Sequence, residues 1–226
     1  MIIYCLLGIT LALALYSLYL VWKAGSRPLT ATYSYLLLGL SLGVFLYLYG
    51  TWIYLSIYSK YVFGCGLLLC CAGYVLRKHD HAARPTPRWK QRSNAVLTLI
   101  FIIFSILYFT GTTGKPDTVE LSFPFKPGRY FVLQGGKGLP TNVFHFSLRG
   151  AVYAMDIVRL NSSGGRANQV YSHNLNDYVI FGDTVYAPCS GRVIRAYSDN
   201  PDNIPPAMNR GPNNTNQVLL EAPGYF

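Results

Sequence analysis

The sequence predicts a membrane protein of two parts, an anchor of four transmembrane helices in residues 1–110 and an all-β extracytoplasmic domain in residues 111–226. The 226-residue chain is 51% hydrophobic and only 12% charged, whereas a soluble domain is about 25% charged. Its first half also confines its charges to short segments between long apolar stretches. After residue 110, Gly, Pro, Asn and Asp become frequent between short β-rich runs, which predicts the second part.

The uncharged stretches set the number of spans. Residues 2–22 and 93–114 carry no charge, and residues 28–76 carry only Lys60. A spanning helix needs about 20 apolar residues, so the outer stretches hold one helix each and the middle stretch holds two. A cleaved signal peptide explains the first stretch less well, because no basic segment precedes it and no small-residue cleavage site follows it. The expected helices cover about residues 2–22, 30–49, 54–76 and 94–110.

The basic residues between the spans predict the orientation. The segment after the first expected helix carries two cations and the segment after the third carries six, whereas the segment after the second carries none. Loops rich in Lys and Arg stay in the cytoplasm. Four spans place both basic loops there and leave the N-terminus and residues 111–226 outside. Three spans would force one basic loop outward, so four is the better prediction.

The net charge of +10 does not indicate a nucleic-acid partner. Residues 1–110 carry nine cations and one acid, and most of those cations belong to the two expected cytoplasmic loops. Residues 111–226 carry ten cations and eight acids, with no basic stripe that alternates with aromatic residues. The expected spans contain no carboxylate or histidine, so an ion or proton pathway lacks support as well. The lipid bilayer is the partner that this composition predicts.

The second part is expected to be an all-β sheet, sandwich or barrel. Turn residues separate its β-rich runs, as is typical of such folds. Cys189 is the only cysteine beyond residue 110, so a disulfide within this domain is excluded. The expected strands cover residues 130–133, 152–159, 178–180, 184–186, 192–196 and 217–220.

Few residues of the second part can carry chemistry. His145 and His173 are its only histidines, and Asp156 lies in the apolar run 153–158. Burial of a carboxylate in such a run is costly unless it is paired or bound to a metal. Imidazole and carboxylate are both common zinc ligands. Two interpretations stay open on spacing alone: a metal site at His145 and Asp156, or an aspartate bonded to loop amides beside a surface histidine.

Three segments together resemble a known family. They are Asn-Val-Phe-His at 142–145, Tyr-Ala-Met-Asp-Ile-Val at 153–158, and Gly-Asp-Thr-Val-Tyr-Ala-Pro-Cys-Ser-Gly-Arg-Val at 182–193. This arrangement is similar to the lysostaphin/LytM-type zinc metalloendopeptidases, in particular to a membrane-attached branch. The resemblance covers residues 135–226. It implies a LytM-like β fold, zinc bound by His145 and Asp156, a core hairpin at 182–193 and a following strand that starts near Asn216.

The implied function is that of a membrane-anchored zinc endopeptidase in a bacterial envelope, acting on peptidoglycan or other peptide bonds outside the membrane. Zinc would lower the pKa of a bound water and polarise the scissile carbonyl. A catalytically inactive binding or regulatory module of the same fold is the alternative, because members of the family that have lost ligands serve in such roles.

The chain departs from the family pattern in two ways. His145 and Asp156 are eleven residues apart, whereas four is the commoner family spacing. The family's third zinc ligand belongs to a later His-x-His segment, whose other histidine assists in activating the water, and no such segment follows in this sequence. The catalytic residues therefore stay unassigned, and we expect a chain truncated before the last ligand. His173 is the remaining candidate for the third ligand.

Overall fold

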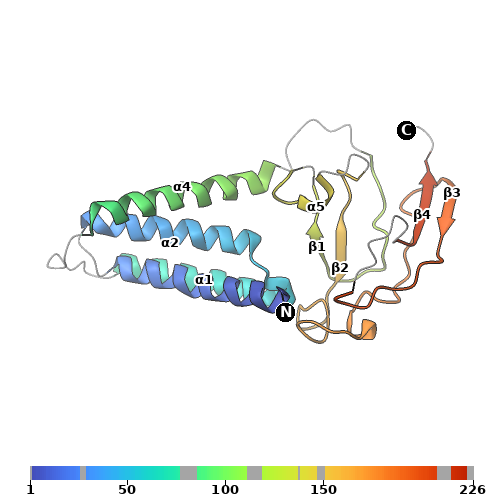
Figure 1. The fold of residues 1–226 in the computed structure, drawn as a ribbon, viewed down its shortest axis with the longest axis horizontal. Helices are drawn as coiled ribbons and strands as arrows, with labels where there is room; N and C mark the ends of the chain where they lie inside the picture. Colours follow the sequence, from blue (N-terminus) through green and yellow to red (C-terminus); the bar gives the residue numbers. More distant parts are fainter. Residues whose placement is uncertain are drawn as a thin grey trace.

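Four long helices form the first part of the protein (Figure 1). The computed structural model describes residues 2–25, 29–76, 86–110, 119–136, 138–146, 151–207 and 215–222. All four helices are long and apolar enough to cross a membrane, which confirms the expected number of apolar helices. Helix α2 packs against α1 and α4, and α1 also packs against α3. They are α1 (Ile2–Ala24), α2 (Leu29–Tyr49), α3 (Ile57–Leu76) and α4 (Arg88–Thr110).

Two helix starts differ from the sequence prediction. A short 3-10 helix, η1 (Trp52–Tyr54), precedes α3, and the hydroxyl of Ser56 accepts a hydrogen bond of 3.1 Å from the amide of Tyr58. This cap starts α3 at Ile57 rather than at residue 54. Helix α4 starts at Arg88, six residues before the apolar run on which the prediction rested. Arg, Lys and Gln are good helix formers, so the helix extends through them.

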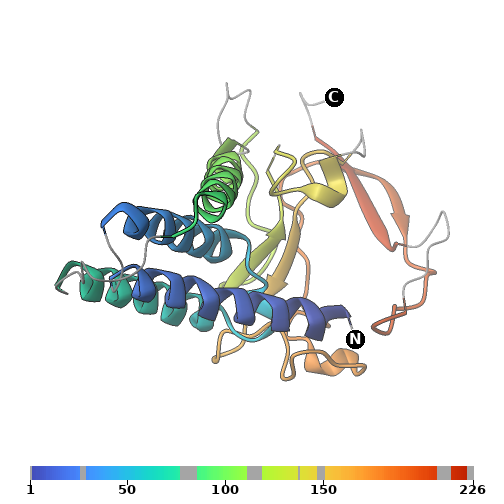
Figure 2. The ribbon, with the colours of Figure 1, turned by 60° about the vertical axis from the view of Figure 1, so that its left-hand side comes forward.

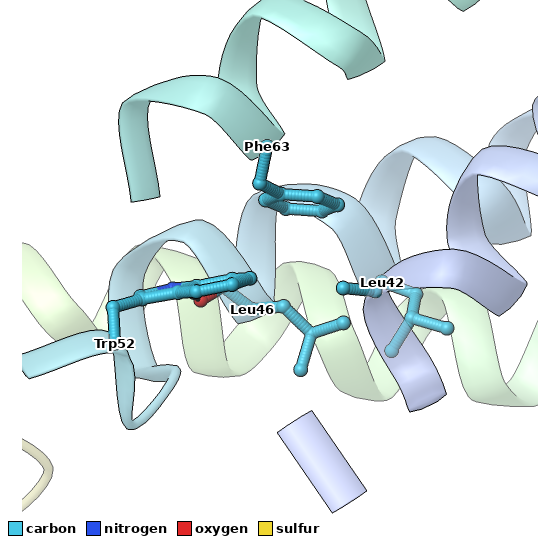
Figure 3. Close-up of a cluster of buried hydrophobic side chains, with 5 residues drawn as sticks. Leu42, Leu46, Trp52 and Phe63 are labelled. Atoms are coloured by element: carbon cyan, nitrogen blue, oxygen red, sulfur yellow. Dashed lines mark hydrogen bonds between the residues drawn. The ribbon is translucent and has the colours of Figure 1, made fainter. Parts of the chain in front are cut away.

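A buried cluster joins α1, α2, η1 and α3 (Figure 3). The indole of Trp52 stacks on Phe63 with 5.1 Å between ring centroids, and its Nε1 donates a 2.8 Å hydrogen bond to the carbonyl of Leu46. Leu42 belongs to the same cluster. Glycine is required at position 50, because a Cβ there would lie 2.4 Å from the Trp52 Nε1. The close approach of this indole thereby fixes the turn between α2 and η1.

The charged helix ends lie together at one end of the bundle. The Nζ atoms of Lys23, at the end of α1, and Lys90, at the start of α4, lie 5.9 and 5.8 Å from the centroid of the Tyr35 ring. The N-terminus and the second part of the chain lie at the opposite end (Figure 1). The described basic residues Lys23 and Lys90 therefore lie at the end of the bundle that faces away from the second part.

The described residues of the second part hold two small antiparallel sheets, which corrects the prediction of an all-β, LytM-like domain. Strand β1 (Tyr130–Gln134) pairs with β2 (Asp156–Arg159), and β3 (Arg192–Tyr197) pairs with β4 (Gln217–Glu221). The chain is about half helical, and these strands are too few for an all-β domain of the LytM kind. The β3–β4 hairpin lies away from the helices, with β1, β2 and the short helix α5 (Val143–Phe146) between them (Figures 1 and 2).

The prediction was wrong because a β-rich run specifies local extension but not a pairing partner or a buried face. Residues 179–182 form turns, and Tyr178 makes one isolated bridge to Ala167. Residues 183–187 are irregular, so no hairpin forms within 182–193; the hairpin starts at Arg192 instead. Strand β3 is exposed at every position except Tyr197. Ala167 is the only buried apolar residue beyond residue 67 among those described.

A loop of the second part docks on the start of α3. The amide of Ile57 donates a 2.9 Å hydrogen bond to the carbonyl of Gly164, and the hydroxyl of Ser56 donates one of 2.6 Å to the carbonyl of Ser163. The guanidinium of Arg166 lies over the ring of Tyr54, 4.5 Å from its centroid. The hydroxyl that caps α3 therefore also joins the two parts of the molecule.

Gly164→Ala is expected to release this loop. Gly164 has a φ of +76°, and a Cβ there would lie 3.0 Å from atoms of Ser56, Ile57 and Tyr58. The backbone strain alone costs about 1 to 3 kcal/mol, so amide hydrogen exchange at Ile57 should accelerate by about tenfold or more. Gly182→Ala is the matched control, because Gly182 has a φ of +78° and nothing within 4 Å. Equal exchange at Ile57 in both variants would contradict the docking contact.

Candidate metal centre

The structure brings His145 and Asp156 together. His145 lies in α5 and Asp156 is the first residue of β2. The Nε2 atom of His145 is 3.5 Å from Oδ1 of Asp156, and their side chains are 18% and 46% exposed. The eleven-residue spacing is closed by a turn at 151–153 between the two elements. The larger spacing therefore does not displace His145 from Asp156.

Asn142 holds the imidazole from the other side. It directly precedes α5, and its carbonyl accepts a hydrogen bond from the amide of Phe146. Residues three apart on a helical turn share a face, so the side chains of Asn142 and His145 meet. Oδ1 of Asn142 is 2.8 Å from Nδ1 of His145. The Asn-x-x-His spacing in the sequence is thus a spacing of hydrogen-bond partners.

The buried amide of Asn142 fixes the tautomer of His145. Asn142 is 0% exposed, and its Nδ2 donates to the carbonyls of Gly136, Val152 and Ala154 at 2.8, 2.8 and 3.3 Å. These three acceptors orient the amide, so Oδ1 is the atom that faces the imidazole. A carbonyl oxygen only accepts, so Nδ1 of His145 must carry the proton. In the neutral imidazole, Nε2 then presents its lone pair toward Asp156.

This geometry fits two ligands of one zinc ion. Zinc lies about 2.05 Å from an imidazole nitrogen and about 2.1 Å from a carboxylate oxygen, so tetrahedral ligands are about 3.4 Å apart. The separation of 3.5 Å between Nε2 and Oδ1 is close to that value. A hydrogen bond to the other imidazole nitrogen is the usual second contact of a metal-bound histidine. If His145 is protonated instead, the same spacing suits an ion pair with Asp156.

The described residues supply two ligands and no third. Among them, no group of three His, Cys, Asp or Glu side chains is close enough to hold a metal ion. His173, the remaining sequence candidate, does not join the pair. Its Nδ1 lies 2.6 Å from the carbonyl of Pro205, and its ring meets Tyr171 edge-on, with 5.8 Å between centroids.

A β-bulge sits beside the pair. Val132 pairs with Ile157 and Gln134 pairs with Asp156, so Leu133 is the extra residue on β1. Bulges of this kind redirect side chains next to functional sites. The Gln134 side chain accepts a 3.3 Å hydrogen bond from the amide of Phe144 through its Oε1 and so ties β1 to α5. Sequence analysis missed Gln134, because nothing in a single sequence marks a bulge.

The segment that resembles the family hairpin is attached to the same sheet. Arg159, at the end of β2, donates hydrogen bonds of 2.8 and 2.9 Å to the two carboxylate oxygens of Asp183. These hydrogen bonds raise the pKa of Arg159, so the guanidinium stays charged. The amides of Ser122 and Tyr186 donate 2.8 Å bonds to the carbonyls of Pro188 and Pro124, respectively. The segment is thus anchored without a regular strand.

In comparisons with known proteins, no protein-family model, no curated protein and no solved structure matches this chain.

Proposed function

We propose that the protein is a membrane-anchored, zinc-dependent endopeptidase that uses His145 and Asp156 as two of its metal ligands. The observation that carries the proposal is the 3.5 Å approach of Nε2 to the carboxylate, with the tautomer set by Asn142. The similarity of segments 142–145 and 153–158 to lysostaphin/LytM-type enzymes gives the reaction class. The proposal rests on this local geometry and does not need an all-β fold.

The residues of the chain have distinct roles in this proposal. His145 presents a neutral nitrogen, Asp156 contributes the negative charge, and Asn142 keeps the imidazole aimed at the carboxylate. When bound, zinc would lower the pKa of a water to near 7 and polarise the scissile carbonyl. The substrate is a peptide cross-bridge of peptidoglycan or another peptide outside a bacterial cytoplasmic membrane. The positions of Lys23 and Lys90 at the far end of the bundle support this orientation.

A non-catalytic binding or regulatory module is the second candidate. The observation that favours it is that the described residues supply only two ligands, because catalytic zinc sites usually have three protein ligands. In such a module, the His145–Asp156 pair would hold a metal weakly or form an ion pair that stiffens the turn before β2. The four helices would then position a binding surface rather than an active site.

Hydrolysis by the 226-residue chain in detergent micelles tests the proposal. We expect the zinc-loaded chain to release new amino groups from cross-linked peptidoglycan or from an unstructured peptide, and a chelator to stop the release. Asp156→Asn should abolish it, because the substitution keeps the shape and removes the charged ligand. His173→Ala is the matched control and should retain it. A zinc-loaded chain that releases no amino groups contradicts the endopeptidase and favours the binding module.

A further inference from the structure

A groove of about 540 Å³ runs between the two parts of the molecule. The end of α2 with the following turn, η1 and the end of α4 form one wall; β1, the turn after it and α5 form the other. Ligand pockets commonly have volumes of about 300–1,000 Å³. Asp156 lies in the lining, so the groove reaches the candidate metal centre.

The lining selects against a charged occupant. Among the described residues that line it, Asp156 is the only charged one, and the others are apolar, aromatic or uncharged polar residues. Tyr49, Tyr54 and Tyr108 come from the side of the helices, and tyrosines at helix ends are typical of the membrane interface. An occupant of this groove therefore lies at the membrane surface and contacts Asp156 with an uncharged segment.

The edge of β1 faces the groove. Residues 131–136 all line it, and successive side chains of a strand point to opposite faces. A groove lined by consecutive residues therefore follows the edge of the strand and not one of its faces. Strand β2 occupies the other edge and is the only strand partner of β1 among the described residues. An open strand edge accepts an extended peptide through backbone hydrogen bonds.

We propose that this groove binds the membrane-proximal segment of a membrane-attached peptide, extended along β1. The substrate class is an uncharged peptide with a lipid or transmembrane anchor. An anchored peptide is confined to the surface on which the groove opens, so its effective concentration there exceeds that of a free peptide. Delivery of its backbone to His145 and Asp156 rests on the proposed function, whereas binding in the groove does not.

Photo-crosslinking of the full chain in phosphatidylcholine vesicles tests the proposal. The probe is a ten-residue peptide of Gly, Ala and Ser that carries one photoreactive leucine and an N-terminal palmitoyl chain. We expect label on residues 131–136 and 48–54, about tenfold stronger than with the unacylated peptide. N-methylation of every backbone amide should remove the label, because it removes all the donors that could pair with β1. Equal labelling by both peptides, or label that survives full N-methylation, overturns the proposal.

Two variants separate this proposal from the proposed function. Phe144→Glu places a second negative charge in the groove and should reduce labelling about tenfold, whereas Phe146→Glu, on the same helix but outside the lining, should not. Equal labelling of these two variants would contradict binding of the peptide in the groove. His145→Ala removes a metal ligand but changes no residue that lines the groove, so the variant should be labelled as strongly as the unsubstituted chain. In the unsubstituted chain, labelling without zinc binding refutes only the enzyme, and zinc binding without labelling refutes only the groove.

Discussion

Asn142→Asp is expected to destabilise the second part of the protein by about 3 to 5 kcal/mol. The substitution keeps the size of the side chain but replaces the Nδ2 donor with a carboxylate oxygen. That oxygen would face the carbonyls of Gly136, Val152 and Ala154 in a site with no exposure to water. Three acceptors would lose their donor, and a carboxylate would be buried with only the His145 imidazole beside it.

Limited proteolysis of the full chain measures the effect. The rate of cleavage between residues 130 and 160 is proportional to the population of molecules in which this region is unfolded. A destabilisation of about 3 kcal/mol raises that population, and hence the cleavage rate, by more than about a hundredfold. Asn216→Asp is the matched control, because Asn216 also donates through Nδ2, at 2.9 Å to the carbonyl of Asn200, but is exposed. It should change cleavage by less than about threefold. Similar cleavage of the two variants would contradict a structural role for Asn142.

Trp52→Ala is expected to cause the largest loss of stability in the helical part. The indole is 3% exposed and fills the space between Leu46 and Phe63. Its removal leaves a cavity and takes from the Leu46 carbonyl one of its two donors, the other being the Gly50 amide, at a cost of about 3 to 5 kcal/mol. The thermal midpoint in detergent, followed by far-ultraviolet circular dichroism, should fall by about 10 °C.

Two further variants identify the cause. Trp52→Phe keeps a stacked ring against Phe63 but removes the Nε1 donor, so it should lower the midpoint by about one third as much. Trp89→Ala removes an indole that is 69% exposed on α4 and should leave the midpoint nearly unchanged. A midpoint that falls equally in Trp52→Ala and Trp89→Ala would show that the buried cluster does not stabilise the bundle.

The helices could be predicted from the sequence because a span is a local property. An uncharged stretch of about 20 residues is sufficient to specify a membrane helix, and α1 and α2 match their expected ranges closely. The start of α4 could not be placed this way, because Arg88 and Lys90 are polar but form helix readily. The separate turn at Trp52 depends on a tertiary contact with Phe63 that no local pattern shows.

The second part was less predictable because sheets depend on distant partners. The positions of β1, β3 and β4 could be predicted from the sequence. The expected strands at 178–180 and 184–186 do not form, and Tyr178 makes only an isolated bridge. At the candidate site, residue types and spacing leave a metal site and a hydrogen-bonded aspartate both open, and the family resemblance implies the pair; the structure brings Nε2 of His145 to 3.5 Å from Oδ1 of Asp156. The roles of Asn142 and Gln134 depend on a buried amide and a bulge, which are properties of the folded chain.

Zinc binding to the 226-residue chain tests the central claim most directly. Equilibrium dialysis of the chain in detergent, with zinc measured by mass spectrometry, gives the stoichiometry and the affinity. We predict one zinc site per chain, with affinity at least about tenfold weaker in His145→Ala and in Asp156→Asn. Binding should be unchanged in His173→Ala, whose imidazole lies against Pro205 and Tyr171. Zinc that binds equally to the parent chain and to His145→Ala would contradict a metal centre at this pair.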